Sequence, residues 1–205
     1  MCSRLSVQIK VQSIINLNKM NKTAATELHR SFLVDQLPEP LTPASSHLQI
    51  FDNYIPNTRL RLRSIRDPYT NAWSYILQQR FLVDENDPAV SKIAEIHLND
   101  AEHSIFDRVV TAEIRKNRYF HEFDNVSFKF DVYLGGLLGL ITARIDFESP
   151  DRMRRFEPPP FAKFEITNDA FFEGENLVSM KFDDVRAEVS RIGSTAISIA
   201  EMPDE

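Results

Sequence analysis

Apolar and polar residues alternate with a period of two along most of the chain after residue 25. Alternation of this kind is typical of a β-strand with one apolar and one polar face. Strands are therefore expected at residues 26–34, 59–65, 73–81, 93–98, 109–120, 127–134, 140–148 and 161–167. The pattern predicts one domain with about seven or eight antiparallel strands.

Turn and capping residues separate these runs. Three prolines mark residues 35–46 as a loop, and the sequence Asp-Pro-Tyr-Thr-Asn at 67–71 predicts a hairpin turn. A glycine cluster at 135–139 predicts a turn before the strand at 140–148. Short helices are expected at 150–156, at 183–198, and after a cap at Asn99 or Asp100, where Ala101, Ile105 and Phe106 would face inward.

Charge is distributed unevenly along the chain. Residues 1–26 carry four basic residues and no acidic one, whereas the remainder holds 20 basic and 30 acidic residues. We interpret residues 1–25 as an N-terminal extension, translated from upstream of a start at Met20, rather than as a targeting signal, because they show strand-like alternation and no cleavage pattern. Residues 26–182 are expected to form the domain, and residues 183–205 a C-terminal helix with an acidic tail.

Composition excludes several classes of protein. Cys2 is the only cysteine, so neither an internal disulfide nor a thiolate metal cluster can form. Glycine-rich phosphate loops, the His-Glu-x-x-His zinc motif and the Gly-x-Ser-x-Gly nucleophile elbow do not occur, so a phosphate ligand would need basic side chains. The net charge of −6 argues against nucleic-acid binding, no run is long enough for a membrane span, and the cysteine usage fits a cytoplasmic protein.

Ionisable residues recur at alternate positions of several predicted strands, so their side chains share one face. These sets are Glu27, His29 and Ser31; Arg59, Arg61 and Arg63; Lys116 and Arg118; Arg144, Asp146 and Glu148; and Lys163, Glu165 and Thr167. An antiparallel sheet with one solvent-exposed face explains the alternation without any function. The alternative is a closed barrel with a polar interior, in which crowded arginines favour a polyanion such as a chain of phosphates.

Six short motifs follow one another along the chain. They are ELHRSFLV at 27–34, RLR at 61–63, IRKNRY at 114–119, FDVY at 130–133, GLITARID at 139–146 and EITND at 165–169. In order and spacing this series, over about residues 26–178, resembles the CYTH domain of the triphosphate tunnel metalloenzymes. The resemblance implies an α+β, mostly β fold: a single-domain eight-stranded antiparallel β-barrel, or tunnel, with a few flanking helices. It also implies binding of a triphosphate by basic side chains and of one or two divalent metals by glutamates.

The chain departs from the family's pattern chiefly where the family binds metal. Of the opening Glu-x-Glu-x-Lys signature only Glu27 remains, since His29 and Ser31 occupy the other two positions. Gln78 occupies the position of a family lysine, and Arg80 lies two residues further on. Of a later pair of family glutamates only Glu95 remains, because Ile93 occupies the other position. Lys129 and Arg144 occupy positions at which the family has carboxylates.

The resemblance thus implies a phosphate site that retains most of its basic side chains and a metal site that has lost several of its carboxylates. The phosphate-binding residues would be Arg30, Arg61, Arg63, Arg80, Lys116, Arg118 and Arg144. A metal, Mg or Mn, would be held by Glu27, Asp146 and Glu165, with Glu95 and Asp131 as further candidates. His29 could bind a transition metal, although a lone strand histidine is more commonly a hydrogen-bonded polar residue. In an active protein Glu27, Glu165 and Lys116 would be catalytic, in metal-assisted phosphoryl transfer.

Three functions are open at this point. The first, which the degraded signature favours, is binding of a small phosphate-chain anion such as inorganic triphosphate, with weak or absent metal-dependent triphosphatase activity. The second is an active Mg- or Mn-dependent triphosphatase, a hydrolase of phosphoanhydride bonds in inorganic or organic triphosphates. The third is a structural barrel without a ligand. No nucleic-acid or membrane partner is expected, and a homodimer is left open.

Overall fold

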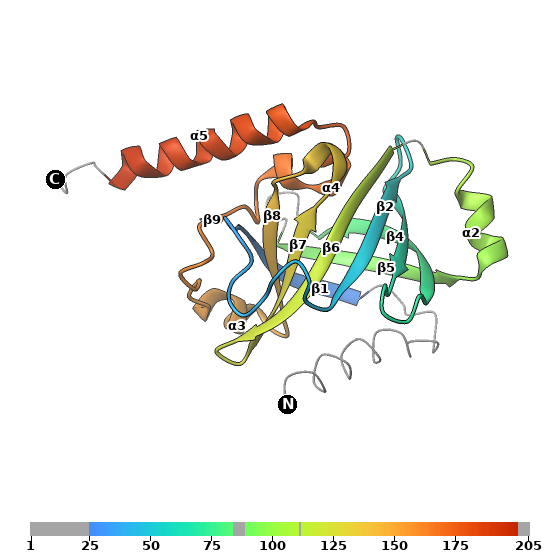
Figure 1. Cartoon of the computed structure of the whole chain (residues 1–205), viewed down its shortest axis with the longest axis horizontal. Coiled ribbons are helices and arrows are strands. Elements are labelled where there is room, and N and C mark those ends of the chain that lie inside the picture. The colour runs from blue at the N-terminus through green and yellow to red at the C-terminus, as the bar shows by residue number, and fades with distance from the viewer. Residues whose placement is uncertain (1–24, 84–88, 111, 201–205) are drawn as a thin grey trace.

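The computed structural model describes residues 25–83, 89–110 and 112–200 (Figure 1). Everything expected of residues 1–24, including a start at Met20, lies outside this part of the chain. The described elements are β1 (Ala25–Leu33), β2 (His47–Tyr54), β3 (Leu60–Arg66), β4 (Trp73–Leu82), β5 (Val90–Leu98), α2 (Asp100–Phe106), β6 (Ala112–Phe123), β7 (Val126–Tyr133), η1 (Gly135–Leu137), β8 (Ile141–Phe147), α3 (Pro150–Arg155), β9 (Phe164–Glu165), η2 (Ala170–Phe172), α4 (Gly174–Leu177) and α5 (Phe182–Ala200).

The strands form one antiparallel sheet that closes into a barrel (Figure 1). Neighbouring strands follow the order β5-β4-β3-β2-β6-β7-β8-β1, and β1 pairs in turn with β5, which completes the ring. Residues Ala25 to Leu28 of β1 pair with β5, whereas Phe32 and Leu33 pair with the two-residue strand β9. The eight-stranded antiparallel barrel expected from the sequence is confirmed.

An aromatic cluster covers the outer face of β1, β7 and β8. Phe32, Phe128 and Phe130 are almost completely buried there. Phe156 and Phe161, from the segment that follows α3, pack over them, with the Phe161 ring 5.2 Å from that of Phe128. Because side chains alternate across a strand, burying these aromatic residues outside the barrel directs the intervening ionisable residues inward.

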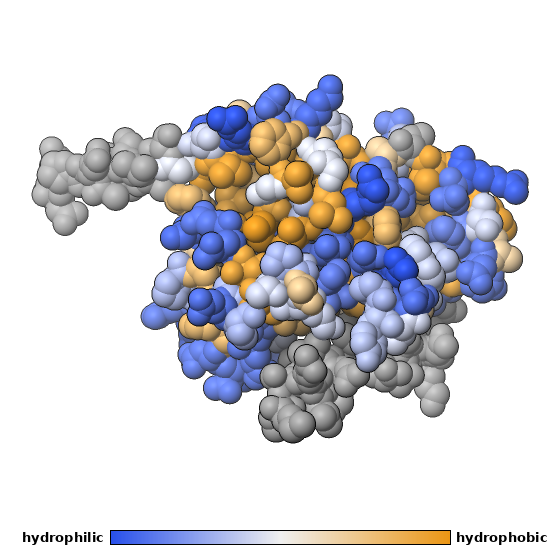
Figure 2. All heavy atoms as spheres, in the orientation of Figure 1, coloured by the Kyte–Doolittle hydropathy of each residue, from blue (hydrophilic) through white to orange (hydrophobic). Residues whose placement is uncertain are grey.

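A second apolar cluster closes one end of the barrel. Leu33, Ile114 and Tyr133 from the strands pack with Leu177 of α4 and Val185 of α5. Figure 2 shows hydrophobic surface beside α5, where this helix crosses that end. The end is therefore covered by the chain that follows β9. No helix within the described ranges is both long and apolar enough to cross a bilayer.

The structure contains a strand that the sequence reading missed. Strand β2 lies between β3 and β6 in the wall of the barrel. Its residues alternate, with Leu48, Ile50 and Asp52 buried and Gln49 and Phe51 less so. Without β2 the barrel could not close, and β2 also contributes side chains to the inner face of the barrel.

The strand expected at 161–167 is shorter than predicted. Only Phe164–Glu165 pairs with β1. The three prolines at 158–160 supply no backbone N–H, and the N–H of Ala162 bonds to the carbonyl of Pro159 in a turn. The segment therefore reaches the sheet only after this turn.

The expected helix after Asn99 is present, but its inner face was assigned wrongly. Of the two expected caps, Asn99 is the one that caps α2, and it does so in a reciprocal arrangement with Glu102. Ile105, however, is 66% exposed. His103 faces the barrel instead, with Nε2 3.0 Å from Ser64 Oγ and its ring 4.0 Å from the ring of Tyr75. A polar contact and ring packing, rather than apolar burial, set the orientation of this short helix.

Candidate functional site

Ionisable side chains from neighbouring strands meet on the inner face of the barrel. Residues opposite one another in an antiparallel pair point to the same side. The directly opposed pairs include Asp52 and Arg63, Arg118 and Asp131, Lys129 and Arg144, and His29 and Asp146. The alternation in the sequence thus reflects a polar interior and not merely a solvent-exposed face.

A buried aspartate anchors one wall of this interior. Asp52 on β2 is 1% exposed, and its two oxygens accept hydrogen bonds from Arg63 Nε and Nη2 at 2.6 and 2.7 Å. Lys116 Nζ and Arg61 Nε lie 3.4 and 3.7 Å from the same carboxylate. Burial alone would raise the pKa of Asp52, but these cations hold it well below its ordinary value. Asp52 is therefore ionised and neutralises part of the basic cluster.

A second buried aspartate continues the network on β7. Asp131 accepts hydrogen bonds from Arg118 Nε and Nη2 at 2.6 and 2.7 Å, and Lys116 Nζ lies 2.9 Å away. Burial opposes ionisation of Asp131, but Arg118 and Lys116 lower its pKa below the usual range. Lys116 thus lies between two carboxylates and links β2 to β7.

The opposite wall is organised around an arginine. Arg144 on β8 donates from Nη2 to Glu27 at 2.7 Å and from Nε to Asp146 at 2.8 Å. Asp146 also accepts a hydrogen bond from Lys129. Burial raises the pKa of Asp146, but Arg144 and Lys129 outweigh it, and the pKa is lowered. The carboxylates of this wall are thus bound by fixed cations.

Beside this wall lies a neutral histidine. His29 is 3% exposed, and its Nδ1 atom has no hydrogen-bond partner. Burial, followed by the charges of Arg144 and Arg80, lowers its pKa to about 3. The imidazole is therefore uncharged at neutral pH.

Helix α4 packs tightly over the covered end of the barrel. A Cβ atom at Gly174 would lie 1.7 Å from the hydroxyl oxygen of Tyr54, so this position admits only glycine without displacement. The same hydroxyl lies 3.4 Å from Arg61 Nη1. The preceding residue, Glu173, accepts a hydrogen bond from Arg80 Nη1. A carboxylate from the segment that covers this end thus contacts an inward-facing arginine.

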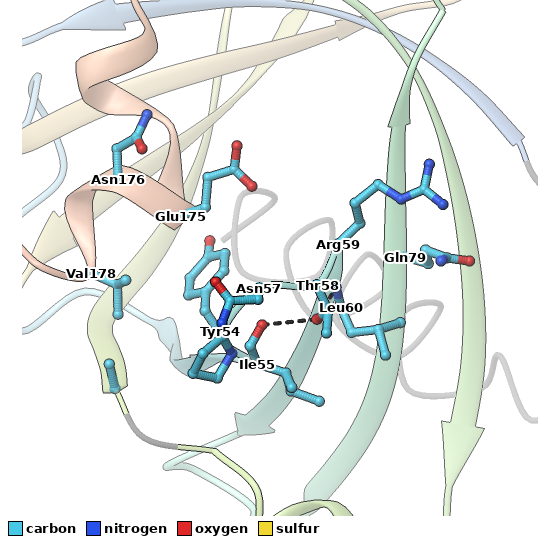
Figure 3. A pocket seen from close by; sticks show the side chains of 12 residues that line it. Tyr54, Ile55, Asn57, Thr58, Arg59, Leu60, Gln79, Glu175, Asn176 and Val178 are labelled. Carbon is cyan, nitrogen blue, oxygen red and sulfur yellow. Dashed lines mark hydrogen bonds between the residues drawn. The ribbon is translucent and has the colours of Figure 1, made fainter.

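A cavity of about 810 Å³ lies between α4 and the loop that joins β2 to β3. Figure 3 shows Tyr54 and Glu175 on one side of it and Arg59 and Gln79 on the other. Because Tyr54 lines this cavity and also contacts Arg61, the cavity borders the polar interior at its covered end.

Most of the predicted site residues are brought together on the inner face, but two are not. Those on the inner face are Glu27, Arg61, Arg63, Arg80, Lys116, Arg118, Arg144 and Asp146. Glu165 lies opposite Phe32 and shares the outer face with Arg30, whose Nε donates to it at 2.8 Å. The Arg30 guanidinium also lies over the rings of Phe32 and Phe156. The two residues are separated from the interior by the β1 backbone, so we leave them out of the proposed site.

Three contributors to the interior were missed in the sequence. Asp52 was overlooked together with β2, although the alternation of Leu48, Ile50, Asp52 and Tyr54 is readable. Tyr54 was missed for the same reason. Glu173 carries no periodic signal, because it precedes a four-residue helix and approaches Arg80 only through the fold.

The donor atoms present do not fit the divalent metal that the resemblance implies. In the described ranges no three His, Cys, Asp or Glu side chains converge as a metal site would require. Glu27 and Asp146 enclose the guanidinium of Arg144, and Glu165 lies on the other face of β1. A cation introduced between these carboxylates would meet fixed positive charge.

Comparisons with known proteins bear on the fold. The sequence matches no protein-family model and no curated protein. A solved structure described as the inorganic triphosphatase NE1496 aligns with a TM-score of 0.51 at 23% identity, over 75% of this chain and 95% of that one. Another, described as the hypothetical protein NE1496, aligns with a TM-score of 0.52 at 21% identity, over 76% and 99%. The closed barrel with its inward-facing ionisable residues and this structural likeness together show that the chain has the CYTH fold.

Proposed function

We propose that this protein binds a small phosphate-chain anion, such as inorganic triphosphate, inside the barrel, with weak or absent hydrolysis. One observation carries the proposal: basic side chains from β3, β4, β6, β7 and β8 converge on the inner face of a barrel with the fold of a triphosphatase. Guanidinium and ammonium groups are the side chains best suited to phosphate oxygens.

The internal ion pairs support binding in preference to turnover. Hydrolysis in a triphosphate tunnel would rely on a divalent metal to polarise the phosphate, and Arg144 lies between the carboxylates that would hold it. Asp52 and Asp131 already form ion pairs with Arg63, Lys116 and Arg118. A phosphate chain must therefore displace or share these partners, which predicts affinity that falls as salt concentration rises.

The test is a set of melting and binding measurements on the whole chain. Inorganic triphosphate should raise the melting temperature in low salt with EDTA present, because ligand at ~100 times its dissociation constant adds about 2.7 kcal/mol to the unfolding free energy. Arg61→Gln should weaken this effect, whereas Arg152→Gln, on the exposed helix α3, should not. Sulfate at matched ionic strength controls for non-specific charge effects.

Phosphate release over inorganic triphosphate, thiamine triphosphate and ATP separates the remaining functions. Binding without release, with or without Mg or Mn, supports the proposal. Brisk release with either metal would establish an active triphosphatase instead. A melting temperature unchanged by millimolar triphosphate would instead support the third function, a structural barrel without a ligand.

A further inference from the structure

Three inward-facing side chains on adjacent strands carry polar atoms that lack a hydrogen-bond partner. These atoms are Arg80 Nε and Nη2 on β4, Ser91 Oγ on β5 and His29 Nδ1 on β1. Among the described residues, the one other such side chain is Asn117, which neighbours the inward-facing Lys116 and so points to the opposite face. The unpartnered atoms are therefore concentrated in one part of the interior.

The registers place these three side chains on the same face of three neighbouring strands. Ser91 lies opposite Leu82 of β4 and opposite Glu27 of β1. Arg80 is two residues from Leu82, and His29 is two residues from Glu27, so all three point to the same side. Ser91 is 0% exposed and His29 is 3% exposed, so both polar groups are buried in the barrel.

The chemistry of these atoms suits an oxyanion. Leaving a buried polar group unpaired is energetically unfavourable, so a cluster of such groups calls for an explanation. The Nε and Nη2 atoms of one arginine form a planar fork that matches two oxygens of a phosphate. A serine hydroxyl and a neutral imidazole can each donate a further hydrogen bond.

Other arginines in the interior lack this free fork. The Nε and Nη2 atoms of Arg63 are bound to Asp52, and those of Arg118 to Asp131. Arg80 uses only Nη1, which donates to Glu173. The Glu173 side chain is 27% exposed, so it can withdraw toward solvent at less cost than the buried aspartates.

We propose that Arg80, Ser91 and His29 bind one tetrahedral oxyanion, the terminal phosphoryl group of the phosphate chain, and that Glu173 competes with it for Arg80. The identification of the oxyanion as the end of a phosphate chain rests on the proposed function. The site itself requires only a phosphate group. Removal of the Glu173 charge should strengthen binding, because one negative charge next to the site is lost.

The test follows the histidine signals by NMR during titration of the whole chain with orthophosphate and with inorganic triphosphate, in EDTA. His29→Gln assigns the His29 signal among the five histidines. The His29 ring should shift on titration, since a neighbouring anion raises the pKa of an imidazole. Arg80→Lys keeps the charge but removes the fork and should weaken affinity by about tenfold. Glu173→Gln should strengthen it by several-fold, while Arg152→Lys on α3 should leave it unchanged.

A further variant tests the site with a smaller change, in case Arg80→Lys or His29→Gln fails to fold. Ser91→Ala removes only an unpartnered hydroxyl and should still weaken phosphate binding. Triphosphate binding that leaves the His29 signal and the Ser91→Ala affinity unchanged would overturn this site while leaving the proposed function standing. Orthophosphate binding that depends on Arg80 and Ser91, without any binding of triphosphate, would support the site and overturn the proposed function. Absence of binding by either anion would overturn both.

Discussion

Arg63 and Asp52 form a bidentate ion pair inside the barrel, with Nε and Nη2 of the arginine 2.6 and 2.7 Å from the two carboxylate oxygens. The pair joins two adjacent strands, β3 and β2, at a point that solvent hardly reaches. Its carboxylate also faces Lys116 and Arg61. The aspartate therefore holds together a cluster of cations that would otherwise repel one another.

Substitution of Asp52 should reveal this role. Asp52→Asn leaves several basic groups buried without their counter-charge, and loss of one partner of a buried ion pair typically costs about 3–5 kcal/mol. Urea denaturation should show a decrease of this size in the unfolding free energy. Asp151→Asn, in the exposed pair with Arg154 on α3, should change it little. Similar small effects for both variants would contradict a structural role for Asp52.

The neutral state of His29 predicts a dependence of stability on pH. Its pKa is lowered by burial, Arg144 and Arg80 to about 3, and Asp146 and Lys129 also act on it. An unfolded histidine titrates near 6.5, so below that pH the unfolded state binds a proton that the folded state refuses. The unfolding free energy should therefore fall as the pH decreases from about 6.5 toward 3.

His29→Gln should flatten this decrease between about pH 6.5 and 4.5, above the range in which aspartates titrate. Burial also lowers the pKa of His121, which is more exposed, so His121→Gln should have a smaller effect in the same direction. Denaturation curves collected across this range provide the measurement. Parallel pH profiles for the parent and His29→Gln would show that the imidazole is protonated inside the barrel.

Gly174 should be intolerant of any side chain. The added methyl group of Gly174→Ala would overlap the hydroxyl of Tyr54, and overpacking of this kind costs about 1–3 kcal/mol. Gly136→Ala is the matched control, because its Cβ would lie 3.9 Å from the nearest atom, the carbonyl oxygen of Met180. Thermal melts should separate the two variants. Equal melting temperatures would mean that α4 does not rest on Tyr54.

Glu165→Gln distinguishes the inner face from the outer face. Because Glu165 pairs with Arg30 outside the barrel, we expect triphosphate affinity to stay within about twofold of the parent. Removal of the charge should lower stability only modestly, since both side chains are partly exposed. A large loss of triphosphate affinity in the folded variant would return Glu165 to the binding site.

The sequence revealed the polar interior because period-two alternation survives in long strands. In β8, Arg144 and Asp146 alternate with buried Ala143 and Ile145, and the structure places them as the pattern predicts. In β1, Arg30 interrupts this alternation, because it occupies a position at which the pattern predicts an apolar residue. It lies with Phe32 on the outer face, and a partner from the distant strand β9 makes that position favourable for a charge.

Other features depend on contacts that no local pattern encodes. The orientation of α2 is determined by His103 against Tyr75, and the contact of Glu173 with Arg80 joins residues 93 positions apart. Glu165 was grouped with the interior acids because alternation indicates which residues share a face but not which face is enclosed. Only the pairing of β9 with β1 decides that question.

The threefold pairing of β1 bears on how the chain folds during synthesis. Among the described strands β1 is made first, yet Arg30 pairs with a residue 135 positions later, and β8 is also distant. At translation rates of about 5–20 residues per second, β1 waits for roughly 7–27 seconds before those partners leave the ribosome. During that interval Phe32 and Leu33, which pair only with β8 and β9, remain unpaired and accessible to other chains. The first described strand to emerge is thus among the last to be enclosed, and chaperones that bind extended apolar segments have their longest opportunity there.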